Sequence, residues 1–244
     1  MIATLPMYDR PETAAANDRL WGLFREAYGD GPNALSRGGD LWEMWQSDNL
    51  LLAQTCGFPY RSRLKDRVTL VGSPDLALEG LPAGYYASVI VAHPRFEGAG
   101  LSALSDATFA YNEPMSQSGW AAPWHHFTRQ DVRIGDRIQS GAHRKSAQMV
   151  AEGKADYAAL DIVSWKMMQR YDTFSSKLVE VARTMPTPAL PYITARYQKP
   201  APIRNALHAA IDALSALERD TLLLQGLVAL PQSAYEAVPN PPKP

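Results

Sequence analysis

Apolar residues follow two alternating patterns along the chain. Short, nearly continuous apolar runs are typical of strands covered on both faces, and they alternate with segments in which apolar residues recur every three or four positions, as in helices packed on one side. Residues 50–55 and 85–92 are the clearest runs, and Leu20, Leu23 and Phe24 mark one face of an early helix. This alternation predicts an α/β protein.

The same patterns predict the order of the elements. Strands are expected at residues 2–5, 34–36, 50–55, 68–71, 85–92, 108–112, 131–134, 156–161, 178–182 and 190–195. Helices are expected at residues 13–28, 40–46, 120–127, 140–153, 162–170, 203–217 and 218–224. The proline-rich tail, residues 239–244, is expected to be loose, as chain ends often are.

Composition narrows the class of protein. The chain has 244 residues, 46% of them hydrophobic and 20% charged, which suits one large domain or two lobes with ample cores. A formal net charge of −1 argues against a nucleic-acid binder and gives no long-range attraction for an anion. Cys56 is the only cysteine, which excludes an internal disulfide. No apolar run approaches the ~18 residues of a membrane span.

The N-terminus departs from that of an exported protein. It begins with Met-Ile-Ala-Thr-Leu and shows no basic segment, apolar segment or small-residue cleavage site. Two interpretations follow: the protein is periplasmic and a signal peptide has been removed, or it works in the cytoplasm.

Residues 110–120 contain the first candidate site. A β-prone run stops at Glu113-Pro114, because proline cannot extend a ladder of hydrogen bonds, and Ser116 and Ser118 follow before an aromatic-rich segment. Hydroxyls and unpaired amides at a strand-to-helix turn suit an anion. The alternative is that either serine only caps the helix.

A second turn of the same kind favours the anion interpretation. Ser140 and Gly141 begin an amphipathic helix after a strand-like segment, about 25 residues beyond the first turn. Two serine- and glycine-rich helix starts, each following a strand, suit a ligand held by helix N-termini.

Three segments carry a resemblance to a known family: LPMYDRPET at residues 5–13, NEPMSQSGW at 112–120, and SGAHRKSAQMVAEGKADYAALD at 140–161. They resemble the phosphonate/phosphate-type substrate-binding proteins of ABC importers, over roughly residues 5–193. The resemblance implies the type II periplasmic-binding-protein fold, an α/β fold of two lobes joined by two crossing strands, each lobe a mixed sheet flanked by helices. Lobe 1 would comprise residues 1–90 and 190–244, and lobe 2 residues 91–189.

The resemblance also implies where the ligand is held. In lobe 2, Ser116 and Ser118 match the family's motif best, and Gly141, His143, Ser146 and Asp161 are the other expected contacts, although the family places a small or polar residue at the position of His143. Asp161 closes the third segment, where the family places an acid that contacts a ligand amine or structures the pocket; a helix N-cap is the alternative. In lobe 1 the resemblance assigns a donor role to Tyr8, which could instead pack against neighbouring prolines.

Further lobe 1 candidates follow the strand at residues 50–55. Thr55 and the amide of Gly57 could donate to an oxyanion, and Tyr60 and Arg61 could line the cleft, because a guanidinium matches a phosphate or carboxylate. Cys56 lies among them, either as a small hydrophobic residue or as a nucleophile.

Two classes of function remain. The first is a binding protein, without enzymatic activity, that captures a small oxyanion such as phosphonate, phosphate or phosphite in an interlobe cleft for an ABC importer. The second is a cytoplasmic enzyme on the same fold, with Cys56, His143 or Asp161 as acid or base; a sensor is a third possibility. The expected partners are a small anionic ligand and an ABC permease, the expected state is a monomer or weak dimer, and no cofactor or metal is expected, since His125-His126 lacks further ligands at zinc spacing.

Overall fold

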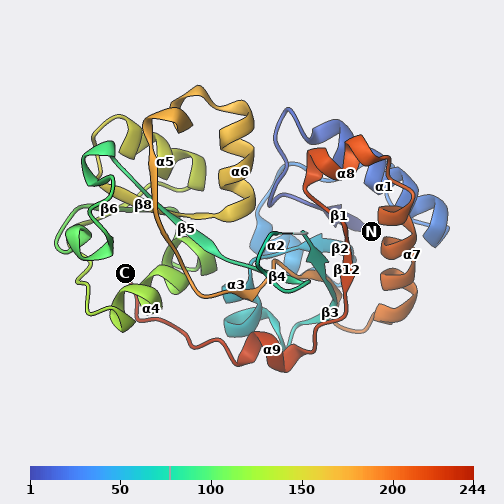
Figure 1. Ribbon diagram of the computed structural model, residues 1–244. Helices are drawn as coiled ribbons and strands as arrows, with labels where there is room; N and C mark the ends of the chain where they lie inside the picture. Colours follow the sequence, from blue (N-terminus) through green and yellow to red (C-terminus); the bar gives the residue numbers. More distant parts are fainter. Residues whose placement is uncertain (77) are drawn as a thin grey trace. The chain divides into compact units, whose positions relative to one another are not determined.

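The chain forms two compact units in the computed structural model, which describes residues 1–76 and 78–244 (Figure 1). Unit 1 comprises Met1–Tyr85 and Pro188–Val238, and unit 2 comprises Tyr86–Thr187 and Pro239–Pro244. These divisions differ from the expected lobe boundaries by a few residues. The C-terminal tail also differs from expectation, since it was assigned to the first lobe and belongs with unit 2 by its contacts.

A five-stranded mixed sheet forms the centre of unit 1, in the order β1-β2-β11-β3-β12. Its strands are β1 (Ile2–Thr4), β2 (Leu50–Gln54), β3 (Val68–Asp75), β11 (Tyr192–Ala195) and β12 (Gly226–Val228). β1 is parallel to β2, and β11 is antiparallel to both β2 and β3. β1, β2 and β3 therefore run in one direction, and their carboxyl ends share an edge of the sheet.

Helices cover both faces of this sheet. They are α1 (Ala14–Tyr28), α2 (Leu41–Trp45), α3 (Gly57–Pro59), the π-helical turn η1 (Tyr60–Leu64), α7 (Pro200–Asp212), α8 (Ala216–Leu222) and α9 (Gln232–Glu236). Phe24 of α1 and Leu207 of α7 pack with Leu51 of β2 in one core cluster. Tyr60 and Tyr235 pack with Leu50 in another. This double coverage explains why every residue of β2 is buried.

Unit 2 contains a second five-stranded mixed sheet, in the order β7-β6-β8-β5-β9. Its strands are β5 (Ser88–Ala92), β6 (Phe109–Tyr111), β7 (Arg137–Gln139), β8 (Tyr157–Asp161) and β9 (Val179–Arg183). β6 is parallel to both β7 and β8, whereas β5 is antiparallel to β8 and β9. The carboxyl ends of β6, β7 and β8 therefore meet at one edge.

The helical elements of unit 2 are η2 (Pro94–Phe96), η3 (Leu101–Leu104), the π-helical turn η4 (Gln117–Ala121), α4 (Ala122–Arg129), α5 (His143–Ala151), α6 (Ile162–Tyr171) and η5 (Thr173–Lys177). Figure 1 shows α4 on one side of the sheet and α5 and α6 on the other. An aromatic cluster fills the α4 side, where Phe109 stacks on Tyr157 at 4.9 Å and Trp120 and Phe127 are fully buried. Aromatic side chains of this size dominate the energetics of a core.

The prediction of mixed sheets flanked by helices is confirmed, as are most of the individual elements. The strand expected at residues 131–134 is wrong. Asp131 adopts a left-handed backbone with φ of 52°, and the amide of Val132 donates to the carbonyl of Phe127, which closes the end of α4. The strand lies instead at Arg137–Gln139. Residues 34–36 form no strand either, although the amide of Ser36 donates to the carbonyl of Ala3 beside β1.

The segments at the unit boundaries form a small sheet of their own. The expected long strand at residues 85–92 is interrupted at Ala87, which leaves β4 (Tyr85–Tyr86) before β5. β4 pairs with β10 (Thr187–Pro188), so the two segments that carry the chain between the units are hydrogen-bonded to each other. Within the part of the chain that the structure describes, no helix combines the length and the apolar character needed to cross a bilayer.

The C-terminal tail is anchored, contrary to the expectation that it is loose. The indole Nε1 of Trp120 donates to the carbonyl of Pro242 at 2.8 Å, and His125 Nε2 lies 3.1 Å from the carbonyl oxygen of Pro239. A sequence pattern shows no partner for a proline-rich end, so this docking could not be predicted.

Candidate functional site

Both serine-bearing turns lie at the same edge of the unit 2 sheet. The first follows β6 and the second follows β7, and these strands are parallel neighbours. Backbone hydrogen bonds also join the turns, since the amide of Ser140 donates to the carbonyl of Tyr111 at 2.8 Å and that of Gly141 to the carbonyl of Asn112 at 2.9 Å. Ligands of open α/β sheets bind beyond the carboxyl ends of strands.

Ser116 forms the N-cap of η4. Its Oγ accepts a hydrogen bond from the amide of Gly119 at 2.9 Å, and its carbonyl accepts from the amides of Trp120 and Ala121 at 3.2 and 3.0 Å. The first turn is thereby widened into a π-helix, a geometry frequent at functional sites. The capping role weighed as an alternative for Ser116 is thus present in the structure.

Ser118 contacts the second turn directly. Its Oγ lies 2.8 Å from Nε2 of His143, the first residue of α5. Ser118 is 3% exposed, whereas the His143 side chain is half-buried. This hydrogen bond joins two residues 25 positions apart and makes the two turns one polar cluster.

His143 is neutral at physiological pH. Burial lowers the pKa of its imidazole to about 4, although the nearby Ala159 backbone acts in the opposite direction. A neutral imidazole carries one N–H donor and one acceptor nitrogen. Nε2 can therefore accept from the Ser118 hydroxyl, or donate to it and leave that hydroxyl able to donate elsewhere.

The remaining predicted residues of unit 2 lie around this cluster. The hydroxyls of Ser140 and Ser146 are 2.7 Å apart, and Ser146 is fully buried. Gly141 is exposed and needs its φ of 86°, which disfavours other residues. Asp161 Oδ1 accepts from the amides of Val163 and Ser164, so its carboxylate caps α6.

Two further residues shape the first turn. A β-carbon added at Gly119 would lie 1.8 Å from Oδ1 of Asn112, so any other residue would require the asparagine side chain to move. Burial raises the pKa of Glu113 beside it. Neither Gly119 nor Asn112 is among the site residues predicted from the sequence; their place in the NEPMSQSGW segment is the signal that could have pointed to them.

The predicted residues of unit 1 gather after β1 and β2. Tyr8 lines a small cavity of about 20 Å³ together with Asn17 and Gln54. Thr55 is fully buried, and its Oγ1 has no hydrogen-bond partner among the described residues. Cys56 is half-buried at the N-cap of α3, and Gly57 is buried next to it.

The side chains of Tyr60 and Arg61 are buried against neighbouring residues. Tyr60 is fully buried, with its ring edge-on to Tyr235 at 5.1 Å, and burial raises the pKa of its phenol to about 12. Arg61 is 6% exposed, and its guanidinium lies 4.6 Å above the ring of Phe58. In this structure both side chains stabilise the loop after β2.

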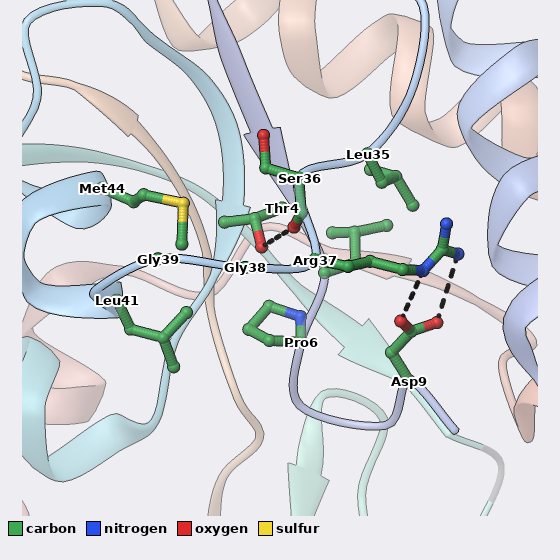
Figure 2. A pocket seen from close by; sticks show the side chains of 11 residues that line it. Thr4, Pro6, Asp9, Leu35, Ser36, Arg37, Gly38, Gly39, Leu41 and Met44 are labelled. Carbon is green, nitrogen blue, oxygen red and sulfur yellow. Dashed lines mark hydrogen bonds and ion pairs between the residues drawn. The ribbon is translucent and has the colours of Figure 1, made fainter. Parts of the chain in front are cut away.

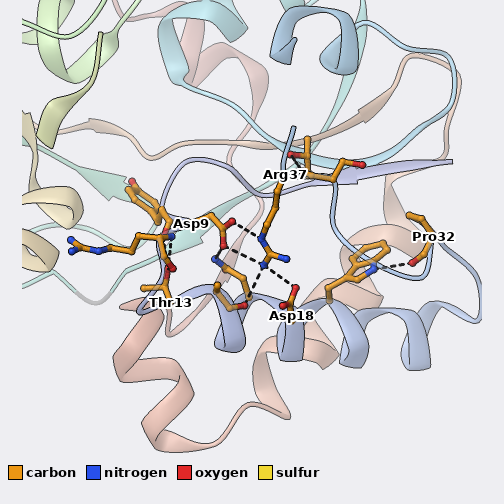
Figure 3. Close-up of polar contacts among 12 residues, drawn as sticks. Asp9, Thr13, Asp18, Pro32 and Arg37 are labelled. Carbon is orange, nitrogen blue, oxygen red and sulfur yellow. Dashed lines mark hydrogen bonds and ion pairs between the residues drawn. The ribbon is translucent and has the colours of Figure 1, made fainter. Parts of the chain in front are cut away.

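A larger cavity of about 240 Å³ lies beside β1 in unit 1 (Figure 2). Its lining within the described chain includes none of the predicted ligand residues. Arg37 reaches it but pairs with Asp9 at 2.7 Å and with Asp18 at 2.8 Å, as Figure 3 shows. These hydrogen bonds raise the pKa of Arg37. Because two carboxylates balance one guanidinium, this cavity is a poor site for an anion.

The described residues were also considered as metal ligands. Across residues 1–76 and 78–244, no group of three or more His, Cys, Asp or Glu side chains is arranged to hold a metal ion.

One family of known proteins matches most of the chain. Residues 46–237 match the family described as "ABC transporter, phosphonate, periplasmic substrate-binding protein". No curated protein sequence matches significantly.

Solved structures share the fold at low sequence identity. PhnD1 from Prochlorococcus marinus, in complex with methylphosphonate, has a TM-score of 0.73 and 15% identity, with 97% of this chain and 95% of that chain covered. A binding protein component of an ABC phosphonate transporter (PA3383) from Pseudomonas aeruginosa has a TM-score of 0.70 and 13% identity, covering 96% and 82%. XAC2383 from Xanthomonas citri, bound to chloride, has a TM-score of 0.67 and 15% identity, covering 96% and 93%.

Proposed function

The chain belongs to the family of periplasmic substrate-binding proteins of phosphonate ABC transporters, and from this premise we propose that it binds a small oxyanion at the serine cluster of unit 2. The ligand class is phosphonate, phosphate or phosphite. The cluster comprises Ser116, Ser118 and His143, with Gly141 and Ser146 beside them. The observation that carries the proposal is the 2.8 Å contact between Ser118 Oγ and His143 Nε2, which brings both helix starts to one point.

The polar groups of this cluster are uncharged hydrogen-bond donors. The ligand's charge would be met by hydroxyls, by amides at the start of η4 and by a neutral imidazole, rather than by a salt bridge. The net charge of −1 is consistent with this, because the chain offers no overall attraction for anions. Such a site selects by the number and direction of its hydrogen bonds, which suits a tetrahedral group with several oxygens.

The binding free energy required exceeds what the serine cluster alone can supply. Micromolar affinity corresponds to about 8 kcal/mol. A hydrogen bond to a charged group contributes about 1.5–3 kcal/mol, before the ligand's lost freedom is subtracted. Three donors from unit 2 therefore fall short once that freedom is subtracted, so the site needs further donors to the ligand.

Isothermal titration calorimetry tests the proposal with methylphosphonate, 2-aminoethylphosphonate, phosphate, phosphite and sulfate. At least one of the phosphorus oxyanions should release or absorb heat, and Ser118→Ala should weaken its binding by about tenfold or more. Ser176→Ala is the matched control, because Ser176 is an exposed serine of unit 2 that donates to a local carbonyl. Absence of binding by all five anions, or equal affinity of the two variants, would contradict the proposal.

Membership of the family also suggests a setting for the protein. We infer that it works in the periplasm, delivers its ligand to an ABC permease, and performs no chemistry of its own. Incubation with each bound anion, followed by phosphorus NMR, checks the last point. The anion should be recovered unchanged, whereas a new phosphorus resonance would favour the enzyme alternative.

A further inference from the structure

The C-terminal tail, Pro239–Pro244, docks on the helix that the first serine turn begins. The tail carbonyl of Pro242 accepts from the indole Nε1 of Trp120 at 2.8 Å. The carbonyl of Pro239 lies 3.1 Å from His125 Nε2. A carbonyl can only accept, so that nitrogen of His125 carries the proton. In Figure 1 the C-terminus lies beside α4, in agreement with these contacts.

Trp120 contacts both the tail and the serine turn. Its side chain is fully buried, 5.6 Å from the rings of Tyr111 and Trp124. Its backbone amide donates to the carbonyl of Ser116 at 3.2 Å. One residue thus links the tail, through its indole, to the N-cap that orders the turn, through its backbone.

The indole needs the tail to satisfy its only polar atom. Nε1–H is a donor without acceptor capacity, and a buried donor is costly when it has no partner. Proline lacks an N–H but keeps a carbonyl, and a proline-rich segment favours an extended form with its carbonyls available. If the tail leaves, Trp120 must turn its indole toward water. Because the aromatic cluster is closely packed, that rotation would also displace the residues at the start of η4.

We propose that the tail is a positioning element for the oxyanion site: docked on Trp120 and His125, it holds η4 so that Ser116 and Ser118 keep the arrangement that binds the ligand. This proposal rests on the proposed function for its ligand. Its structural half, the ordering of the turn by the tail, stands on the contacts above. The tail itself touches no ligand in this scheme and acts through Trp120.

The experiment compares two truncations of the full chain. One ends at Val238 and removes both tail contacts; the matched control ends at Lys243 and keeps both carbonyls as peptide groups while removing only Pro244. Trp120→Phe is the third variant, because it keeps an aromatic ring at this position and loses the indole N–H donor. For each, hydrogen–deuterium exchange reports the amides of Gly119 and Trp120 without ligand, and calorimetry reports the affinity for methylphosphonate and inorganic phosphate.

In the chain that ends at Val238, and also in Trp120→Phe, the amides of Gly119 and Trp120 should exchange about tenfold faster than in the control. The affinity of both proteins for the anion should fall about tenfold. Their combination should lose little more than either alone, since both remove one interaction. A synthetic peptide of residues 237–244, added at millimolar concentration, should restore protection to the truncated chain but not to Trp120→Phe.

Unchanged amide exchange in both altered chains, or a peptide that fails to restore protection to the truncated chain, overturns the proposal. If the truncated chain fails to fold, Trp120→Phe decides the outcome by the same two readouts. If the unaltered protein binds no oxyanion, the proposed function fails, while amide exchange still decides whether the tail orders the turn.

Discussion

Lowering the pH from 7 to 5 should destabilise the folded protein through His143. Burial lowers the pKa of this imidazole to about 4 in the folded chain, whereas an unfolded histidine titrates near about 6.5. Between these values the unfolded chain binds a proton that the folded chain does not. The free energy of unfolding therefore falls as pH falls through this window, and the loss is complete below the folded pKa.

The size of the effect follows from the shift. A displacement of about 2.5 pKa units corresponds to about 3.4 kcal/mol in full, and at pH 5 the linkage relation gives about 2 kcal/mol. The residue as a whole is half-buried, although its Nδ1 is enclosed, so these figures are upper bounds. A loss of this size is large for a protein whose total stability is about 5–15 kcal/mol.

Urea denaturation at pH 7, 6 and 5 measures the effect, with His143→Gln as the comparison. Glutamine does not titrate, and its amide can still reach the Ser118 hydroxyl. Other groups change charge in this range, including His126, whose pKa burial also lowers, but they are common to both proteins and cancel in the difference. The variant should lose less stability than the parent by up to about 2 kcal/mol at pH 5. Parallel pH curves for the two proteins would refute the assignment of a buried neutral imidazole.

Substitutions at three further positions have expected outcomes that thermal and urea unfolding can check. Gly119→Ala should cost about 1–3 kcal/mol, because its β-carbon would meet Oδ1 of Asn112 at 1.8 Å; full retention of stability would show that the asparagine moves freely. Gly22→Ala is the contrasting case, since it lies within α1 with no atom within 4 Å of the added carbon, and it should stabilise by up to about 1 kcal/mol. Asp161→Ala should cost about 0.5–2 kcal/mol by uncapping α6, whereas Asp161→Asn should keep most of that stability. If Asp161→Asn keeps stability and loses affinity, the carboxylate contacts the ligand as well as the helix.

Local patterns predicted most of the fold because the elements are locally consistent. The apolar run of β2 and the 3.6-residue repeat of α1 each match the burial that tertiary structure imposes. The strand expected at 131–134 failed for a local reason: Asp131 takes a left-handed backbone, and the chain needs that turn to leave α4 before β7 begins. β-propensity alone cannot reveal such a turn.

The positions of the two serine turns could be predicted from the sequence, whereas their role in binding a ligand stays a prediction. Serines after a β-prone run indicated the turns, and the parallel pairing of β6 with β7 brings those turns together. Which hydroxyl meets which ring could not be predicted, because the Ser118–His143 contact depends on the register of two elements 25 residues apart. Tyr60 and Arg61 illustrate the opposite case, since polar residues after a strand can be packed inward by the neighbouring helix, here α9 for Tyr60.

Neither unit is one continuous stretch of the polypeptide, and this matters for anyone who wishes to study the units apart. Excision of residues 86–187 alone would deliver a fragment whose tryptophan at position 120 has lost its acceptor, since Pro242 lies outside that range. A faithful minimal fragment would require residues 239–244 to be joined back through a designed linker. For the same reason, a purification tag is better placed at the N-terminus than after Pro244.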